Sequence, residues 1–518
     1  MNIIPHPKKT EKISGSFFIK QGDVIFCDEQ FLKNVRRFMQ MVEQCANITL
    51  AMTDDIGSAN IIFTRDESAL PESYFIMLSQ GVATIKCADD AGCFYAVETL
   101  RQLFDLDRPR EQISCVDCYI EDSPKYRYRG LMLDICRHFF DADTIMRIID
   151  IMSQVKLNKL HLHLSDDQGF RIEIKKYPEL NLVGSTRNGS EVVKNGKRYV
   201  DDKVVSGYLT QCDIQKLVSY ASERHIDIIP EIDLPGHCVA LLTAFPQFSC
   251  TGQVTEVRKQ WGISKDILCA GNEKVYPFIC DVLDEICEMF PSQYVHLGGD
   301  EAPKDRWCNC KLCRERMAEL NLSGFDELQT NMIEVFRKHL VHKGKTVICW
   351  NDGITPSSSK DIVMQVWKPF TTNQGAREAN SGRKVIMSPF SKMYFDYPYG
   401  MTPLSKTLHY VPSKGVKKQF LSNVMGVEAC LWTEYVEDTD KLFFNLLPRI
   451  DALAECAWGY RGVKFGKRMR KRFEIYEKVG LVYNGKATLN GCRKLHTVRN
   501  FFKKDANIEL NEYLYKQK

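Results

Sequence analysis

The feature that most constrains the fold is a series of eight short apolar runs between residues 129 and 434. In residues 159–166, Leu alternates with His and Ser, which is the period of a strand with one apolar face. Strands that alternate with helices predict a parallel sheet, and eight of them predict a closed (β/α)8 barrel. The other runs are residues 129–135, 227–233, 294–301, 345–352, 361–367, 384–390 and 426–434.

The segments between these runs show the spacing of amphipathic helices. After the first run, Ile145, Ile148 and Ile149 recur on one face of a helical pattern. Thr210 and Asp213 have the spacing of a capping box, which predicts a helix start. A doubly wound sheet is the alternative, but no Gly-rich phosphate loop follows the first run. Helical patterns lie at residues 144–157, 275–290, 326–342 and 443–458.

The chain is too long for one compact core, so we predict more than one domain. Residues 1–122 contain short strand-like runs at 59–64, 73–79 and 82–88, followed by a helical pattern. We therefore predict the α/β class, with a (β/α)8 TIM barrel over residues 123–467 preceded by a small α+β domain over residues 1–122. Residues 468–518 are basic and predict a helical appendage.

Charge and cysteine content limit the partners and the compartment. The formal net charge is only +4 for 518 residues, which gives no reason to expect nucleic acid or a membrane surface as partner. No apolar run approaches the length of a membrane span, and the N-terminal residues lack the apolar segment of a secretory signal. We therefore interpret the 20 cysteines as mostly reduced thiols and expect a cytoplasmic protein.

Polar and aromatic residues gather where the predicted strands end, which is where a barrel carries its site. The set is rich in carboxylates and tryptophans and has no basic cluster for a phosphate. Carboxylates accept hydrogen bonds from hydroxyls, and indole faces pack on the apolar face of a sugar ring. These positions are Asp134, Arg137, His161, His163, Asp166, Asp167, Asp233, His237, Asp300, Glu301, Trp350, Trp367, Tyr394, Asp396, Trp432 and Glu434.

Asp300 and Glu301 are neighbouring acids that follow Gly298 and Gly299. Neighbouring side chains of a strand point to opposite faces, so both acids reach one site only if the backbone leaves strand geometry. The two glycines permit such a turn. Two adjacent acids would approach a sugar from one side. That suits one acid for the leaving oxygen and one for a neighbouring substituent, but it does not suit a nucleophile on the far face.

The sequence resembles the β-N-acetylhexosaminidases of glycoside hydrolase family 20. The resemblance rests on an ordered set of segments from residue 129 to residue 434. The N-terminal segment GVATIKCADDAGCFYAVETLRQL also resembles the small domain that precedes the barrel in this family. The segments are RGLMLDICRHFF, NKLHLHLSDDQGFRIEI, PEIDLPGH, HLGGDE, CWND, VMQVW, YFDY and LWTE.

The resemblance implies retaining, substrate-assisted removal of a terminal β-linked N-acetylhexosamine from an oligosaccharide or glycoconjugate. It implies that Glu301 is the general acid and then the base, and that Asp300 orients the 2-acetamido group as that group forms an oxazolinium ion. Tyr394 would donate to the acetamido oxygen. No cofactor and no metal are implied. The implied substrate-binding residues are Trp350, Trp367 and Trp432 as walls, Arg137 and Glu434 at the 3- and 4-hydroxyls, Asp396 at the 6-hydroxyl, and Asp166 with His237 beside the acid.

Two positions depart from the family pattern. Phe170 stands where many relatives carry Trp, and Asn351 stands where an acid is common. Neither is an implied contact of the sugar, so the departures concern local packing or specificity.

Two other functions remain as alternatives. A metal-dependent barrel hydrolase would use His161 and His163 together with His237 and Asp300, but it leaves the tryptophans unexplained. The favoured interpretation makes His161 and His163 hydrogen-bonded residues of the barrel interior. A non-catalytic sugar-binding protein would need a broken catalytic set, whereas each implied position holds the expected residue type.

Cys308, Cys310 and Cys313 form half of a zinc motif, because the second pair of ligands is absent nearby. Free thiols in a loop are the favoured interpretation. Structural zinc, with a fourth ligand from another cysteine, is the alternative, and a disulfide is possible in an exported protein.

Overall fold

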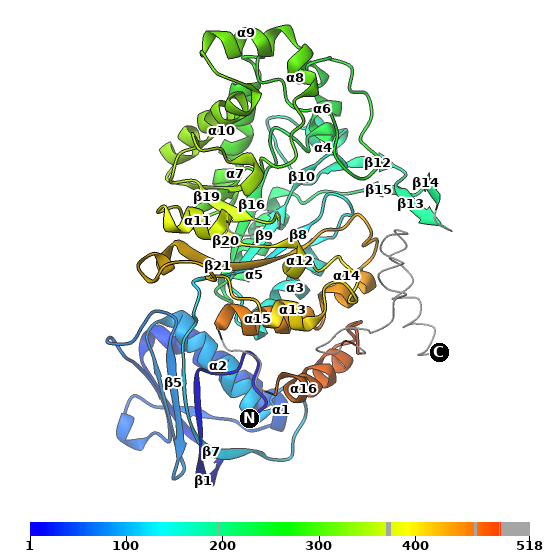
Figure 1. Cartoon of the computed structure of the whole chain (residues 1–518). Coiled ribbons are helices and arrows are strands. Elements are labelled where there is room, and N and C mark those ends of the chain that lie inside the picture. The colour runs from blue at the N-terminus through cyan, green and yellow to red at the C-terminus, as the bar shows by residue number, and fades with distance from the viewer. Residues whose placement is uncertain (195–196, 369–373, 460–463, 486, 488–518) are drawn as a thin grey trace. The chain divides into compact units, whose positions relative to one another are not determined.

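The computed structural model describes residues 1–194, 197–368, 374–459, 464–485 and 487 (Figure 1). Contacts divide the chain into two compact units. One contains residues 1–127, 151–157 and 450–481, and the other contains residues 128–150, 158–449 and 482–518. The domain boundaries predicted after residues 122 and 467 stay a prediction, and residues 488–518 of the predicted appendage lie outside the described residues. Among the described residues, no helix combines the length and the apolar content needed to cross a membrane.

The second unit is a closed barrel of eight parallel strands, as predicted. Its hydrogen-bonded order is β16-β17-β18-β19-β20-β21-β8-β9. Each strand falls within, or largely overlaps, one of the eight apolar runs of the sequence. The strands are β8 Tyr128–Asp134, β9 Lys159–His163, β16 Asp227–Glu231, β17 Tyr294–His296, β18 Thr346–Trp350, β19 Val363–Val366, β20 Val385–Met387 and β21 Val424–Leu431.

The strands are buried on both faces, which explains their nearly continuous apolar sequences. All seven residues of β8 and all eight of β21 are buried. Inside the barrel, apolar side chains from different strands meet in one layer that includes Tyr128, Ile229 and Ile348. This layer fills the barrel interior with side chains, as in barrels whose site lies at the carboxyl ends of the strands.

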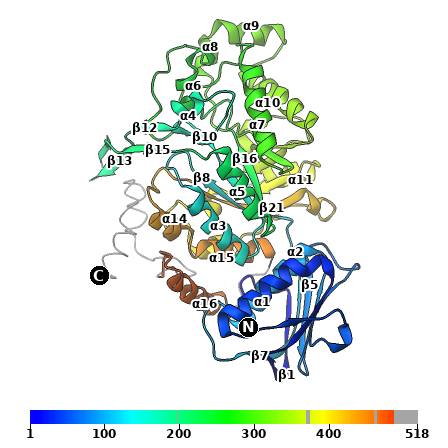
Figure 2. The same cartoon turned by 180° about the vertical axis from the view of Figure 1, so that it is seen from behind.

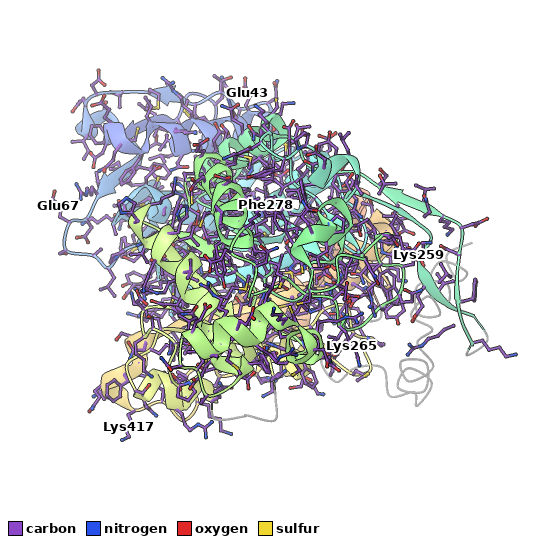
Figure 3. The ribbon with its side chains drawn as sticks, turned by 90° about the horizontal axis from the view of Figure 1, so that it is seen from above. Glu43, Glu67, Lys259, Lys265, Phe278 and Lys417 are labelled. Atoms are coloured by element: carbon purple, nitrogen blue, oxygen red, sulfur yellow. The ribbon has the colours of Figure 1, made fainter. Side chains whose placement is uncertain are left out.

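Helices cover the outside of the barrel (Figure 2). Helix α5 (Gln211–Ser222) packs on β16, and α10 (Phe325–His342) packs on β18 and on α7 (Val275–Met289). Helix α5 begins with the predicted capping box, in which Thr210 and Asp213 each accept from the other's backbone amide. Phe278 of α7 (Figure 3) lies among the rings of Tyr177, Phe245 and Phe248, so aromatic packing holds this part of the layer.

The single helix predicted over residues 443–458 is wrong. The structure has two helices there, α14 (Thr439–Leu446) and α15 (Arg449–Trp458). Pro448 separates them, because proline has no amide hydrogen and its ring collides with the preceding turn of a helix.

Short strands and helices lie in the connections between the barrel strands and the helices of this unit. Three small antiparallel pairs, β10 with β11, β12 with β15 and β13 with β14, lie between β9 and α5. The remaining elements are α3 Ala142–Gln154, β10 Ser165–Asp166, β11 Gly169–Phe170, α4 Glu179–Leu182, β12 Thr186–Asn188, β13 Glu191–Lys194, β14 Lys197–Val200, β15 Val204–Ser206, α6 Val239–Ala244, α8 Asp305–Asn309, α9 Lys311–Glu319, α11 Gln374–Asn380, α12 Phe390–Met393 and α13 Leu404–Leu408.

The first unit is an α+β structure built on one seven-stranded sheet. Its order is β1-β7-β5-β6-β4-β2-β3, and helices α1 (Leu32–Ala46) and α2 (Asp90–Phe104) share a core with it. Helix α16 (Phe465–Lys478) groups with this unit by its contacts. The strands are β1 Lys9–Ile19, β2 Val24–Cys27, β3 Ala51–Met52, β4 Ile61–Arg65, β5 Tyr74–Ser79, β6 Val82–Cys87 and β7 Ile113–Asp122, of which β4, β5 and β6 were predicted.

Candidate active site

A pocket of about 160 Å³ opens at the carboxyl ends of the barrel strands. It brings together nine of the eleven residues predicted for the site. Because clefts for drug-sized ligands measure roughly 300–1,000 Å³, this volume suits one small ring rather than a long chain. Its lining residues are Arg137, His237, Asp300, Glu301, Trp367, Tyr394, Asp396, Tyr397, Trp432 and Glu434.

The lining comes from loops that leave six different strands. Arg137 follows β8 and His237 follows β16, while Asp300 and Glu301 follow β17. The remaining lining residues follow β19, β20 and β21. In a parallel barrel all strands end at the same rim, so residues far apart in the sequence converge there.

A strained turn places the two neighbouring acids. Strand β17 ends at His296, and φ is +63° at Gly298, +98° at Gly299 and +45° at Glu301. A Cβ atom on Gly298 would lie 1.7 Å from Oδ1 of Asp233, so a larger residue does not fit. The Gly299 amide donates to the same oxygen at 3.0 Å. The prediction that the backbone leaves strand geometry at the two glycines is therefore confirmed, and both acids line one pocket.

His237 lies between the paired acids and a buried aspartate. Its Nε2 is 3.8 Å from Oδ2 of Asp300 and 3.7 Å from Oε2 of Glu301. Its Nδ1 is 3.4 Å from Oδ1 of Asp166. Burial lowers the pKa of His237, but Asp166, Glu301 and Asp300 together raise it well above its ordinary value. The surrounding carboxylates therefore favour the cationic form of the imidazole.

Asp300 is the more enclosed of the two acids. Its side chain is 11% exposed, against 29% for Glu301. Burial, followed by the charges of Asp352, Glu301 and Glu231, raises the pKa of Asp300 to about 7, although His237 opposes the shift. Within the described part of the chain, Oδ1 of Asp300 has no hydrogen-bond partner. This oxygen is thus available to accept from a donor in the pocket.

Aromatic rings form the walls. Trp367 and Tyr394 lie nearly parallel, with ring centroids 6.3 Å apart and planes inclined by 16°. Tyr394 also lies 6.1 Å from Trp432, and burial raises the pKa of its phenol well above the ordinary value. A phenol that keeps its proton can only donate or accept as a neutral group. These three rings therefore offer flat apolar faces and the hydroxyl of Tyr394 to the pocket.

Arg137 and two acids form the polar side of the pocket. The Arg137 guanidinium binds Asp166 at 2.8 Å and Asp134 at 3.3 Å, and it lies 5.0 Å from the centre of the Trp432 ring. Burial raises the pKa values of Asp396 and Glu434. Oδ1 of Asp396 is buried with no hydrogen-bond partner among the described residues. These groups suit a ligand that offers several hydroxyls.

Two predicted site residues lie behind the lining. Asp166 is 1% exposed and joins Arg137 to His163 and His237. Trp350 is also 1% exposed; its Nε1 donates to Glu231 at 2.8 Å and its ring lies 6.0 Å from Trp432. Both therefore support lining residues in this structure, and the predicted role of Trp350 as a pocket wall stays a prediction.

Three contributing residues were missed in the sequence. Asp352 accepts from the Glu301 amide at 3.1 Å and from Nε1 of Trp367 at 2.8 Å, so it ties an acid to an aromatic wall. Tyr397 lines the pocket. Glu231 is fully buried and accepts from Trp350. A charged residue inside the apolar run 227–233 was the available signal for Glu231.

His161 and His163 are buried, hydrogen-bonded residues of the barrel interior, as the favoured interpretation had it. His161 pairs with Glu428 at 3.0 Å and with Glu231 at 3.2 Å, and His163 pairs with Asp166 and Glu231. Neither lines the pocket. Nδ1 of His161 and both ring nitrogens of His163 are thus hydrogen-bonded to buried carboxylates outside the pocket lining, which disfavours a metal-dependent hydrolase that would use them.

The two departures from the family pattern lie outside the lining. Phe170 is fully buried in β11. Oδ1 of Asn351 accepts from the Trp367 amide at 2.9 Å, so this residue helps to fix the position of an aromatic wall.

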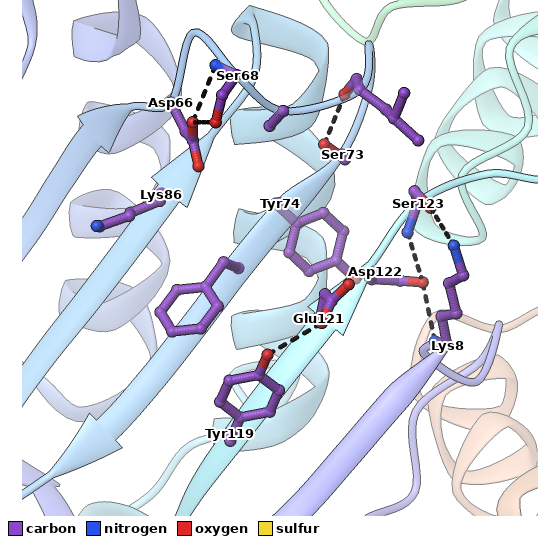
Figure 4. A pocket seen from close by; sticks show the side chains of 13 residues that line it. Lys8, Asp66, Ser68, Ser73, Tyr74, Lys86, Tyr119, Glu121, Asp122 and Ser123 are labelled. Carbon is purple, nitrogen blue, oxygen red and sulfur yellow. Dashed lines mark hydrogen bonds between the residues drawn. The ribbon is translucent and has the colours of Figure 1, made fainter.

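A larger concavity of about 490 Å³ lies in the first unit (Figure 4). It contains no tryptophan, arginine or histidine among its lining residues. Asp122 accepts from the Lys8 amide and Glu121 accepts from Tyr119, so these carboxylates are already engaged. It therefore lacks the tryptophan walls and the arginine of the barrel pocket, although acids and other aromatic residues line it.

The fold and the site together define a class of protein. It is a parallel barrel whose strand ends carry paired acids, an arginine and aromatic walls, and these groups suit a bound sugar. Comparison with known families matches residues 126–460 to glycosyl hydrolase family 20, catalytic domain, and residues 1–123 to glycosyl hydrolase family 20, domain 2. The chain belongs to glycosyl hydrolase family 20.

Named relatives agree with this assignment. The chain is 35% identical over 482 residues to a β-hexosaminidase of Porphyromonas gingivalis, covering 88% of this chain and 60% of the relative. It is 32% identical over 414 residues to a β-hexosaminidase of Akkermansia muciniphila, covering 77% and 82%. The chain thus spans about three fifths of the length of the Porphyromonas relative.

Solved structures show the same fold. An exo β-N-acetylglucosaminidase of Vibrio harveyi in complex with N-acetylglucosamine superposes with a TM-score of 0.83 at 26% identity, over 93% of this chain and 78% of that one. A β-N-acetylhexosaminidase of Bacteroides fragilis superposes with a TM-score of 0.79 at 27% identity, over 93% and 96%.

Proposed function

We propose that the chain hydrolyses terminal β-linked N-acetylhexosamine from the non-reducing end of oligosaccharides or glycoconjugates. One observation carries the proposal: Asp300 and Glu301 are consecutive, and both line one small pocket with aromatic walls. Membership of glycosyl hydrolase family 20 and the activities named for its relatives support the same substrate class.

The proposed reaction retains the anomeric configuration and uses the substrate's own acetamido group as nucleophile. Glu301 protonates the glycosidic oxygen and later takes a proton from water. Asp300 accepts from the acetamido N–H and stabilises the positive charge of the oxazolinium ion. Its available Oδ1 supports this role. Tyr394 donates to the acetamido oxygen that attacks the anomeric carbon.

The remaining lining residues hold the ring. Trp367 and Trp432 pack on its faces, and Trp350 supports Trp432. Arg137 and Glu434 bind the 3- and 4-hydroxyls, and Asp396 binds the 6-hydroxyl. Asp166 orients His237 beside the two acids. A pocket of about 160 Å³ with Arg137, Asp396 and Glu434 in its lining supports exo action on one terminal sugar. A cytoplasmic location is also part of the proposal; it rests on the sequence alone.

Rates on matched chromogenic β-glycosides test this function. We expect hydrolysis of the N-acetylglucosamine glycoside, inhibition by a thiazoline analogue of the cyclised intermediate, and no measurable hydrolysis of the glucoside, which lacks the acetamido group. The N-acetylgalactosamine glycoside reports the preference at the 4-hydroxyl. Equal rates on the glucoside would contradict acetamido participation, and binding without turnover by folded protein would favour a sugar-binding protein.

A further inference from the structure

Four cysteines from two separate loops meet at one point of the barrel unit. Cys250 and Cys269 come from the connection between β16 and α7, and Cys310 and Cys313 come from the connection between β17 and α10. Their sulfurs all lie within 4.8 Å of one another. Cys308, the third cysteine of the sequence motif, is exposed and does not belong to the group.

Three of the distances between the sulfurs match the edges of a tetrahedral metal site, and all of them are within 4.8 Å. Sγ of Cys269 lies 3.7 Å from Sγ of Cys310 and 3.6 Å from Sγ of Cys313, and Cys313 lies 3.8 Å from Cys250. Four sulfurs bound to one zinc ion at about 2.3 Å form a tetrahedron with edges of about 3.8 Å.

Two disulfide bonds would explain this arrangement of the four sulfurs less well than a single metal ion does. A disulfide brings two sulfurs to about 2.05 Å and leaves other sulfurs farther away. Here Cys269 is equally close to Cys310 and to Cys313, and Cys313 is equally close to Cys250 and to Cys269. Sulfurs that share their neighbours in this way surround a common centre.

We propose that Cys250, Cys269, Cys310 and Cys313 bind one structural zinc ion. All four ligand positions belong to the protein, as in closed structural sites rather than catalytic ones. Sulfurs this close together leave room for a single ion but not for a cluster of several irons. The sequence interpretation favoured free thiols because only Cys310 and Cys313, half of this ligand set, lie close together in the sequence. Cys250 and Cys269 lie far from them in the chain.

The backbone around the cysteines is built for close approach. The strand bridge between Ser249 and Leu268 places Cys250 beside Cys269. A Cβ on Gly271 would lie 2.1 Å from the carbonyl carbon of Leu312, so only glycine lets the two loops meet here. The Gly271 amide is a hydrogen-bond partner of both Cys269 and Cys313, and metal-bound thiolates commonly have such partners.

Besides the cysteines, the α8–α9 segment (Figure 1) is held by Trp307, whose indole N–H donates to the Leu268 carbonyl, and by ion pairs of Arg306 with Asp266 and of Arg316 with Glu273. Cys313 is the one buried residue of α9, and Trp307 is the one buried residue of α8. The ion pair between Lys265 (Figure 3) and Asp305 joins two largely exposed side chains, which contributes little to stability. A metal that links the two loops would add a direct connection between them at the buried Cys313.

The same two loops carry site residues. The Leu268 amide donates to the carbonyl of Pro235, two residues before His237, and α8 begins four residues after Glu301. A zinc ion at the four cysteines would therefore fix the loop of His237 relative to the loop of Glu301, from a position outside the pocket lining.

Metal analysis of the full chain, purified under reducing conditions without chelator, tests the proposal. We expect one zinc ion per chain by mass spectrometry of the elements. Alkylation of the native protein should modify Cys308 and spare the four ligands, which become reactive once a mercurial reagent releases the zinc. Iron in place of zinc, metal-free protein with reactive thiols, or two mapped disulfides would each overturn the assignment.

Two variants locate the metal. Cys310→Ser combined with Cys313→Ser should lose the zinc, whereas Cys308→Ser, two residues from Cys310, should keep one ion per chain. Equal zinc content in the two proteins would overturn the assignment. If the double variant does not fold, the alkylation pattern of the wild-type chain still decides the question.

Discussion

Nε2 of His237 lies 3.7 Å from Oε2 of Glu301, and on its other side the imidazole faces the buried Asp166. His237 has φ +49° and Glu301 has φ +45°, so both members of this pair occupy a backbone conformation that non-glycine residues rarely adopt. Such strain persists where the surrounding structure holds it, and it clusters at functional sites. The contact between His237 and Glu301 therefore joins the loops that follow β16 and β17, beside the two acids of the pocket.

Replacing His237 should change the pH profile. Burial raises the pKa of Asp300 to about 7 even though the charge of His237 lowers it. In His237→Gln this pKa rises further, so the ionised form of Asp300 appears only at higher pH. If that form is the active one, the acid limb of kcat/KM moves to higher pH and kcat at neutral pH falls at least tenfold. His409→Gln, at an exposed position, is the control; an unmoved acid limb in His237→Gln would show that this charge does not act on the site.

Glu301→Gln tests the proposed acid. We expect kcat to fall by roughly 10²–10⁴-fold on an oligosaccharide, because the departing sugar oxygen then lacks a proton donor. The loss should be much smaller on a glycoside with a strongly acidic phenol, which leaves without protonation. Thermal unfolding should stay the same within about 1 kcal/mol, since the Glu301 side chain is partly exposed. Equal losses on both substrates would argue against acid catalysis by Glu301.

Asp300→Asn should cost activity but stabilise the fold at high pH. The Asp300 pKa of about 7 exceeds the ordinary 3.8. The native state therefore holds a proton that the unfolded chain releases, and the free energy of unfolding falls as pH rises from about 4 to about 7. Asparagine avoids this loss, worth on the order of 2–4 kcal/mol above pH 7.

Unfolding measured at pH 4 and pH 8 checks this sign. The variant should exceed the wild type in stability at pH 8 and match it at pH 4, while kcat falls by about 10²-fold or more at pH 8, where the wild-type Asp300 is ionised. A variant that is less stable at pH 8 would show that ionised Asp300 has favourable partners in the native state.

Local periodicity predicted the barrel and much of the site. Leu160, Leu162 and Leu164 alternate with polar residues, and the eight runs became the eight strands. The placement of Asp300 and Glu301 in one pocket was expected from the turn that Gly298 and Gly299 permit. These features are visible in sequence because each depends on residues close together in the chain.

Other contributions depend on pairs that only the fold brings together. Asp352 binds Trp367 and the Glu301 amide across two loops, and Cys250 reaches Cys313 across 63 positions. Trp350 was expected at the pocket wall, but its indole N–H turns to the buried Glu231. A buried donor needs an acceptor, and no periodic pattern reveals which one it finds.

Gly298→Ala tests how tightly the turn at the acids is built. An added Cβ would lie 1.7 Å from Oδ1 of Asp233 at a backbone φ of +63°, so both collision and backbone strain oppose it. Gly344→Ala is the matched control, because Gly344 has φ +78° and nothing within 4 Å of the new atom. The control should cost about 1–2 kcal/mol of unfolding free energy from backbone strain alone. Gly298→Ala should cost clearly more and reduce kcat at least tenfold, because Asp300 and Glu301 would shift with the turn. Equal destabilisation by the two variants, measured in denaturant, would mean that the turn yields easily and that the neighbouring acids do not depend on its tight packing.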